Sequence, residues 1–411
     1  MTMVGDGAYA IWVTPASARA WRIAGTPSDI DAEVDALRET ISVVEDGQTI
    51  TYPFDVDRAH ALFRRLLDPA TDELRSVRHL VFEPDGGMLR LPPNLLVAEE
   101  SGLAAYRARA ARPGDDGFDF TGIGWLGRDR DISTAVSAAS FRDIRRIAPS
   151  RAAHEYLGYG ENAPADAFLA PPSGPRAALS GCAWSPAVWN QPVSADELRT
   201  AGSALAHGVP GEADVVTGAA FTDDAIKARA DLAQYRILHF ATHGLVAAPR
   251  ADCPAQPALL TSFGGAGSDG LLTFGEIFDL RIDADLVILS ACDTAAQAGL
   301  AATRAAGITS GGDFALDGLV RAFVGAGGRS VVASHWPVPD DYDATRRLIS
   351  GLFGAAPGEP TATALRRAQR TLMDDPATSH PYYWSGFAIV GDGARPVIPG
   401  NSGTPSAAGA N

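Results

Sequence analysis

Two residue types that support nucleophilic catalysis each follow an apolar run in the second half of the chain. His243 comes just after the run at 236–241 (RILHFA), and Cys292 comes just after the run at 285–290 (DLVILS). Both runs are predicted to be buried strands of a parallel sheet, and ligands bind at the carboxyl ends of such strands. If the two strands are neighbours, the imidazole can raise the thiolate fraction of the cysteine, whose ordinary pKa is about 8.5.

Backbone N–H groups beside this pair could hold a developing oxyanion. Gly244 leaves the N–H after the histidine open to a carbonyl oxygen, and the N–H of Cys292 could supply the second donor. The residues alone also allow a plainer interpretation. A cysteine after an apolar strand can be a small buried residue, and a histidine before a glycine can be a turn residue.

Metal and cofactor chemistry is not indicated. His239 and His243 have HxxxH spacing, but on a strand they lie about 13 Å apart, and Phe240 stands where a zinc-dependent peptidase needs Glu. The glycine-rich run at 264–270 lacks a following Lys-Ser/Thr, so it is not a phosphate loop. We interpret that run as a mobile loop on the substrate side or as a plain linker.

The elements around the pair predict an α/β fold. Apolar strands at 236–241, 285–290, 329–334 and 387–390 alternate with helices at 273–278, 313–326, 341–353 and 361–373. This alternation is typical of a mostly parallel sheet with helices on both faces. The first 150 residues predict an opening hairpin at 9–21, helices at 30–41 and 56–67, and a strand at 77–82.

Composition restricts the classes of protein that the chain can represent. Lys and Arg number 34 and Asp and Glu number 49, so the 411-residue chain carries a net charge of −15. That charge argues against nucleic-acid and polybasic membrane binding. Neither a secretory signal nor a membrane span is predicted. The three cysteines, Cys182, Cys253 and Cys292, form no CxxC pair, so we expect a reduced, cytoplasmic protein without disulfides or zinc.

Six segments together resemble CHAT-domain proteins, which are caspase-like cysteine peptidases related to separase. The resemblance extends from Tyr9 to Asp392. It is carried by the segments at 80–93 (LVFEPDGGMLRLPP), 239–244 (HFATHG), 289–294 (LSACDT), 317–328 (DGLVRAFVGAGG), 329–337 (RSVVASHWP) and 380–392 (HPYYWSGFAIVGD).

The resemblance implies a caspase-like three-layer α/β/α sandwich with a mostly parallel central sheet. It implies that His243 is the general base or imidazolium partner and Cys292 the nucleophile, that residues 151–394 form the catalytic half, and that residues 1–150 form a degenerate, non-catalytic half. The composition of residues 395–411, which are mostly Pro, Gly, Ser and Ala, predicts a disordered tail.

The resemblance also bears on specificity. In separase-like relatives an acid in the loop after the Trp-Pro turn receives a basic P1 side chain, so Asp340 or Asp341 could favour Arg or Lys in the substrate. Here Pro339 intervenes, which departs from the family pattern, and Asp341 could instead cap the following helix. Asp269, before the Leu271-Leu272 pair, is a weaker candidate for the same role.

The function predicted from the sequence is a cysteine endopeptidase that cleaves a protein substrate through a thioester. No cofactor is expected. A regulatory repeat or sensor region is expected from the family, either on another polypeptide or on a part of the protein outside this sequence, as is a role in bacterial immunity or cell death. The alternative is a catalytically silent caspase-like scaffold for protein–protein interaction, and a ligase or transpeptidase that uses the same thioester is a third option.

Overall fold

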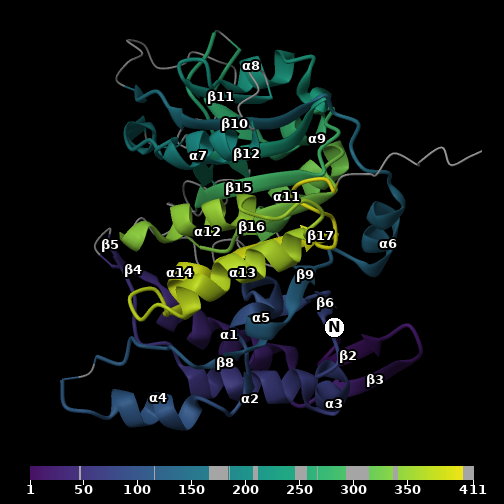
Figure 1. Ribbon diagram of the computed structural model, residues 1–411, viewed down its shortest axis with the longest axis vertical. Coiled ribbons are helices and arrows are strands. Elements are labelled where there is room, and N and C mark those ends of the chain that lie inside the picture. Colours follow the sequence, from purple (N-terminus) through teal and green to yellow (C-terminus); the bar gives the residue numbers. More distant parts are fainter. Residues whose placement is uncertain are drawn as a thin grey trace, which may run out of the picture.

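The computed structural model describes residues 1–45, 48–114, 116–165, 184, 186–206, 212–245, 257–265, 267–292, 314–336 and 341–400; of Cys292 and Asp341 it describes the backbone alone. One large β-sheet runs from β11 near the top of the molecule to β6 below its middle (Figure 1). Its strand order is β11-β10-β12-β15-β16-β17-β9-β6, and the short strands β13 and β14 attach beside β12.

The strands of this sheet are β6 (His79–Phe82), β9 (Asp131–Thr134), β10 (His154–Asn162), β11 (Ala213–Gly218), β12 (Tyr235–Leu245), β13 (Ala258–Leu260), β14 (Leu271–Thr273), β15 (Leu286–Cys292), β16 (Ser330–Ser334) and β17 (Phe387–Gly391). The longer helices are α1 (Pro27–Ile41), α2 (Val56–Leu67), α4 (Leu103–Ala110), α6 (Ala138–Arg146), α7 (Asp196–Leu205), α11 (Phe314–Ala326), α12 (Ala344–Phe353) and α13 (Thr361–Met373). Shorter helices are α3 (Thr71–Leu74), α5 (Leu126–Asp129), α8 (Asp223–Ala228), α9 (Phe274–Phe278) and α14 (Pro381–Trp384).

Strand direction divides the main path of the sheet into two blocks. Pairs from β11 through β16 are parallel, β16 and β17 are antiparallel, and β17, β9 and β6 are again parallel to one another. The sheet is therefore mostly parallel, which confirms the predicted fold class. Because β6 and β9 precede residue 150, the sheet is continuous across the predicted division of the chain, and a separate role for each half stays a prediction.

Helices cover both faces of the sheet. Successive side chains of a strand alternate between these faces, so each strand contributes to both cores. Ile237 packs into the core that contains α12 and α13, whereas Leu238 and Phe240 pack into the core that contains α9 and α11. All of β12 is buried, as its apolar sequence predicts for a central strand. Burying a large aliphatic side chain of this kind contributes about 1.5–3 kcal/mol.

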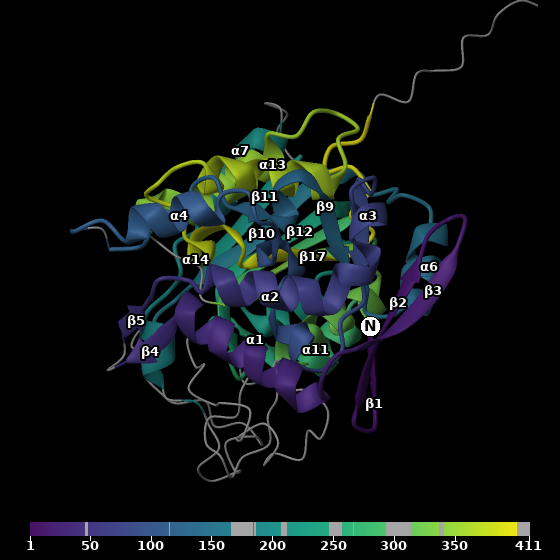
Figure 2. The ribbon, with the colours of Figure 1, turned by 90° about the horizontal axis from the view of Figure 1, so that it is seen from below.

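Apart from β6, most of the first 100 residues lie at the β6 end of this sheet, at the bottom of Figure 1 and toward the viewer in Figure 2. A three-stranded antiparallel sheet, β1 (Thr2–Val4), β2 (Gly7–Val13) and β3 (Ala18–Ile23), contains the predicted hairpin. Helix α2 has the predicted bounds, with Asp55 as its N-cap. Two small antiparallel pairs, β4 (Val43–Glu45) with β5 (Gln48–Ile50) and β7 (Val97–Glu99) with β8 (Gly124–Trp125), complete the region.

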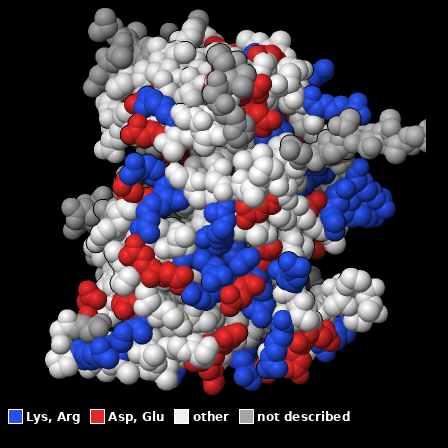
Figure 3. All heavy atoms as spheres, viewed as in Figure 1, with Lys and Arg blue, Asp and Glu red and all other residues white. Residues whose placement is uncertain are grey.

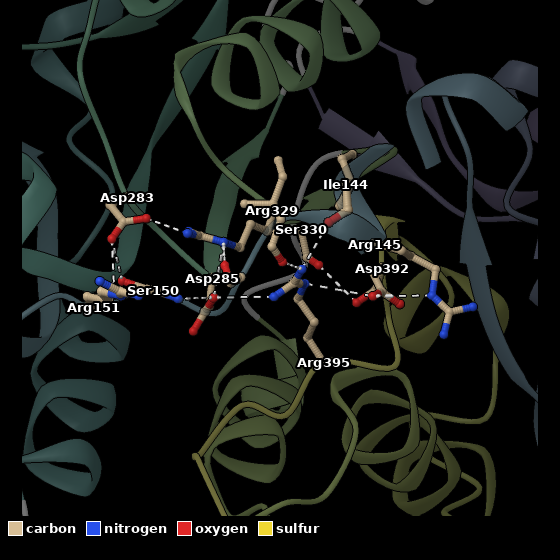
Figure 4. A network of polar contacts seen from close by, with 12 residues as sticks. Ile144, Arg145, Ser150, Arg151, Asp283, Asp285, Arg329, Ser330, Asp392 and Arg395 are labelled. Atoms are coloured by element: carbon tan, nitrogen blue, oxygen red, sulfur yellow. Dashed lines mark hydrogen bonds and ion pairs between the residues drawn. The ribbon is translucent and has the colours of Figure 1, made fainter. Parts of the chain in front are cut away.

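A buried ion-pair network ties the segment around residue 150 to the amino ends of β15 and β16 (Figure 4). Arg329 pairs with Asp283 and donates from Nε to the Ala148 carbonyl at 2.8 Å. Asp285 accepts from the Ser150 N–H at 3.0 Å. Arg395 donates to the carbonyls of Ile144 and Ile147 at 2.9 and 2.6 Å, so the network also fixes the chain after β17.

The contacts of Arg395 correct the prediction of a disordered tail from residue 395. Arg395 accepts a hydrogen bond at its carbonyl from the Thr361 N–H at 2.7 Å, and Val397 is fully buried. A buried aliphatic side chain and a buried guanidinium hold residues 395–398, although composition alone indicates a flexible segment. Residues 401–411 lie outside the described part of the chain.

The face formed by α12 and α13 shows arginines interspersed with carboxylates (Figure 3). Arg347 pairs with Asp375 at 3.0 Å, Arg366 with Asp131 at 2.7 Å, and Arg128 with Asp374 at 2.6 Å. The basic side chains seen there are thus locally neutralised. No helix in the described ranges has both the length and the apolarity needed to cross a bilayer.

Candidate active site

The strands that end at His243 and Cys292 are neighbours. Strands β12 and β15 pair in parallel from Ile237 with Leu286 to His243 with Cys292. Neighbouring strands lie about 4.8 Å apart, so the register brings the backbones of the predicted pair together at the carboxyl edge of the sheet. A Cβ at Gly244 would lie 3.3 Å from the Ala291 carbonyl oxygen, so the glycine permits a close approach of the two strands.

The imidazole of His243 is buried and held in one orientation. Its side chain belongs to a residue that is 6% exposed, and Nε2 lies 2.5 Å from the carbonyl oxygen of Gln191. A carbonyl only accepts, so Nε2 carries the proton and Nδ1 has the free lone pair. Burial lowers the pKa of His243 below its ordinary 6.5, although the hydrogen bond to Gln191 opposes that shift. Nδ1 is buried and has no hydrogen-bond partner among the described residues.

The carbonyl that orients His243 comes from a segment in which the sequence predicts no helix or strand. Gln191 directly follows η6 (Pro186–Asn190), a short 3-10 helix. Trp189 anchors this helix, with its Nε1–H donated to the Thr261 carbonyl at 2.8 Å and its ring stacked on Phe263 at 4.8 Å. The sequence does not identify Gln191, because any residue can supply a backbone oxygen. The aromatic Trp189 within a polar, proline-rich stretch is the feature that could indicate this segment.

Comparison with known proteins assigns the chain to a family. The profile of the CHAT domain matches residues 56–392, which agrees with the resemblance carried by the sequence motifs. The chain belongs to the CHAT-domain family. The matched range includes both His243 and Cys292, and it also includes β6 and β9 from the first 150 residues.

Two curated relatives of the CHAT domain are tetratricopeptide repeat protein 28 from Mus musculus and from Homo sapiens. They are 28% identical over 148 and 145 residues, which is 35% of this chain. The aligned part spans only 5% of either relative. Among solved structures, the Saccharomyces cerevisiae separase–securin complex matches 66% of this chain and 14% of its own, with a TM-score of 0.35 and 12% identity.

The glycine-rich loop of this CHAT domain is anchored to α8 at its described residues. The Ser268 hydroxyl is bonded to Asp223 and accepts from the Gly264 N–H at 2.9 Å. Asp223 is fully buried and pairs with Lys227 at 2.8 Å. Lys227 also binds Glu276 at 3.0 Å, so helices α8 and α9 and the loop form one ionic unit.

The residues predicted to form the substrate pocket are only partly described. Asp340 lies outside the described ranges, and so do Cys182 and Cys253. Asp341 falls in a single 3-10 turn, η8 (Asp341–Asp343), and α12 begins after it with Asp343 at the N-cap. The alternative role of Asp341 as the helix cap is therefore wrong, because Tyr342 and Asp343 adopt positive φ and delay the start of the helix. Asp269 accepts from the Leu271 N–H at 3.2 Å and closes a turn.

A second buried polar cluster lies on the same strand as His243. His239 is fully buried, with Nδ1 2.9 Å from the Tyr156 hydroxyl and Nε2 3.3 Å from Glu197. Burial and the nearby Glu197 raise the pKa of Tyr156 well above its ordinary 10. His239 therefore has partners of its own four residues before His243. Among the described residues, no group of three or more His, Cys, Asp or Glu is arranged to hold a metal ion.

Proposed function

We propose that this CHAT domain is a cysteine endopeptidase in which Cys292 is the nucleophile and His243 the general base. The observation that carries the proposal is the register of β12 and β15, which pairs these residues at the carboxyl ends of two parallel strands. The buried, unpartnered Nδ1 of His243 supports it further, because a general base needs a free lone pair.

In the proposed reaction the thiol proton of Cys292 moves to Nδ1 of His243 while the sulfur attacks the peptide carbonyl carbon. The C–N bond then breaks, and Nδ1 returns the proton to the leaving amine, so a thioester and a free amine result. Water attacks the thioester and gives its proton to Nδ1; the C–S bond then breaks, and Nδ1 returns the proton to the leaving thiolate, which releases the acid and restores the thiol. The backbone N–H groups of Gly244 and Cys292 are proposed to hold the oxyanion.

The Gln191 carbonyl takes the place that a carboxylate occupies in other catalytic triads. A carboxylate would stabilise imidazolium, whereas a neutral carbonyl fixes the tautomer without adding a charge. Burial lowers the pKa of His243, so the imidazole is neutral at pH 7 and can accept the thiol proton.

Thiol reactivity tests the proposal directly. At neutral pH, iodoacetamide should modify Cys292 faster than Cys182 and Cys253, as measured by peptide mass spectrometry over time. His243→Ala should remove this difference in rate. His154→Ala, a substitution at the amino end of β10 and so at the opposite end of the strands, should not. Equal or slower modification of Cys292 in the wild type would favour the scaffold instead.

The substrate is proposed to be a protein with a basic P1 residue, received by Asp340 or Asp341. A peptide library compared between wild type and Cys292→Ala tests cleavage, and Asp340→Ala and Asp341→Ala test the P1 preference. The curated relatives are named tetratricopeptide repeat proteins, which supports the proposal of a repeat-containing regulator, in the same protein or on another polypeptide. Cleavage that survives in Cys292→Ala would refute the assignment.

A further inference from the structure

The Gln191 carbonyl depends on two buried side chains that the reaction itself does not use. Trp189 is 4% exposed and Asn162 is 2% exposed. Asn162 Nδ2 donates to the Trp189 carbonyl at 2.9 Å and to the Ala163 carbonyl at 3.1 Å. Trp189 in turn donates to the Thr261 carbonyl at 2.8 Å. These contacts fix the peptide two residues before Gln191 from both its backbone and its side chain.

An irregularity in β10 aims Asn162 at this segment. The pairing of β10 with β11 shifts between Gly160 and Asn162, and the intervening Glu161 has a φ of 50°. A non-glycine residue in the left-handed region is strained, and bulges of this kind redirect side chains next to functional sites. Arg199 holds the strained Glu161 by an ion pair of 2.6 Å. The bulge thus places the Asn162 amide at the carboxyl edge of the sheet.

The space around Trp189 leaves little freedom for its ring. Phe263 stacks on one side with an interplanar angle of 25°. Gly270 lies so close that a Cβ there would be 2.9 Å from Trp189 Nε1, and its φ of +75° also disfavours other residues. Rotation of the indole would therefore break its hydrogen bond and clash with the loop.

We propose that Asn162 and Trp189 are positioning residues that hold the Gln191 carbonyl against His243. With the acceptor fixed at Nε2, the proton stays on that nitrogen and Nδ1 remains basic; when the acceptor moves away, both neutral tautomers become populated. The catalytic meaning of this arrangement rests on the proposed function, but the tautomer of His243 does not.

The tautomer can be measured in the full chain by NMR of ¹⁵N-labelled histidine side chains, with His243→Gln to assign the signals. In the wild type, Nε2 of His243 should be protonated and Nδ1 unprotonated. Trp189→Phe keeps the aromatic ring but removes the N–H donor, and Asn162→Leu removes the amide donor. In both variants the Nδ1 signal should move toward the protonated position, and alkylation of Cys292 should slow about fivefold, the factor that one net hydrogen bond supplies.

Trp125→Phe is the matched control. Trp125 is 2% exposed, but its Nε1 has no hydrogen-bond partner among the described residues, so the same substitution there should leave His243 unchanged. A wild type with Nδ1 protonated would overturn the proposal, as would folded Trp189→Phe or Asn162→Leu protein that keeps the wild-type tautomer. If one variant does not fold, the other decides. A slow Cys292 in the wild type together with the expected tautomer shifts would refute the peptidase and leave the positioning role intact.

Discussion

Protonation of His380 should destabilise the fold in acid, because this histidine is built into the interior as a neutral group. It is 2% exposed, and both ring nitrogens have partners. Nε2 lies 2.9 Å from the Tyr52 carbonyl and so donates, whereas Nδ1 accepts from the Tyr382 N–H at 3.1 Å. Phe118 and Phe120 contact the ring. A second proton would have to replace the Tyr382 hydrogen bond that caps α14.

Burial lowers the pKa of His380 from 6.5 to about 4. The unfolded chain then binds more protons between these two values, so stability is fully present above pH 6.5 and falls as the pH drops toward 4. Each pH unit costs at most about 1.4 kcal/mol per histidine, which gives a loss on the order of 3 kcal/mol over this range.

Urea unfolding at several pH values tests this expectation. The free energy of unfolding of wild type should fall more steeply below pH 6.5 than that of His380→Gln, which cannot titrate there. The difference between the two curves isolates His380 from the other groups that titrate in acid. If the curves of wild type and His380→Gln run parallel from pH 7 to pH 4, the reasoning from burial is refuted.

Three further outcomes are expected. Lys227→Met removes the only lysine of the sequence and leaves buried Asp223 without its cation, so the free energy of unfolding should fall by about 3 kcal/mol. Lys227→Arg should recover most of this lost stability. Equal stability of Lys227→Met and wild type would contradict the expectation. Arg329→Met should cost about 3 kcal/mol in the same urea assay, because Asp285 is 8% exposed and loses a cation, and a loss below about 1 kcal/mol would mean that the pair is solvent-screened. The rate of Cys292 alkylation should fall on acidification with a midpoint below pH 6.5, since burial lowers the pKa of His243 and the base stays neutral to lower pH; a midpoint above 6.5 would contradict this lowered pKa.

Much of the fold could be predicted because burial leaves a periodic pattern in the sequence. Helices α2 and α13 have the predicted bounds, since their apolar residues recur at helical spacing, and β12 and β15 contain the mostly apolar runs that predicted them. The direction of β17 could not be predicted. The sequence of β17 fits a parallel or an antiparallel neighbour equally well, and its antiparallel pairing with β16 is set by the path of the chain through α12, α13 and α14.

The site could be predicted only where a side chain carries the chemistry. His243 is a titratable residue after an apolar strand, and that signal is visible in the sequence. Gln191 contributes a backbone oxygen, which any residue would supply. Asn162 reaches the site through a bulge at Glu161, and no periodicity indicates where a strand becomes irregular. The irregular segment before α7 thus supplies the contact that decides which nitrogen of His243 is basic.

The environment of His243 favours a neutral base over a permanent ion pair. Desolvation is the main influence on the pKa of His243. Among the described residues, the uncharged Gln191 carbonyl is the only opposing influence. No carboxylate in the described ranges lies against the imidazole, whereas the buried Arg329 pairs with Asp283. A neutral imidazole with a free Nδ1 cannot stabilise a resting thiolate by charge. The Cys292 thiol would therefore lose its proton as it attacks. Cys292 should then react faster with a substrate that completes the site than with a small alkylating agent.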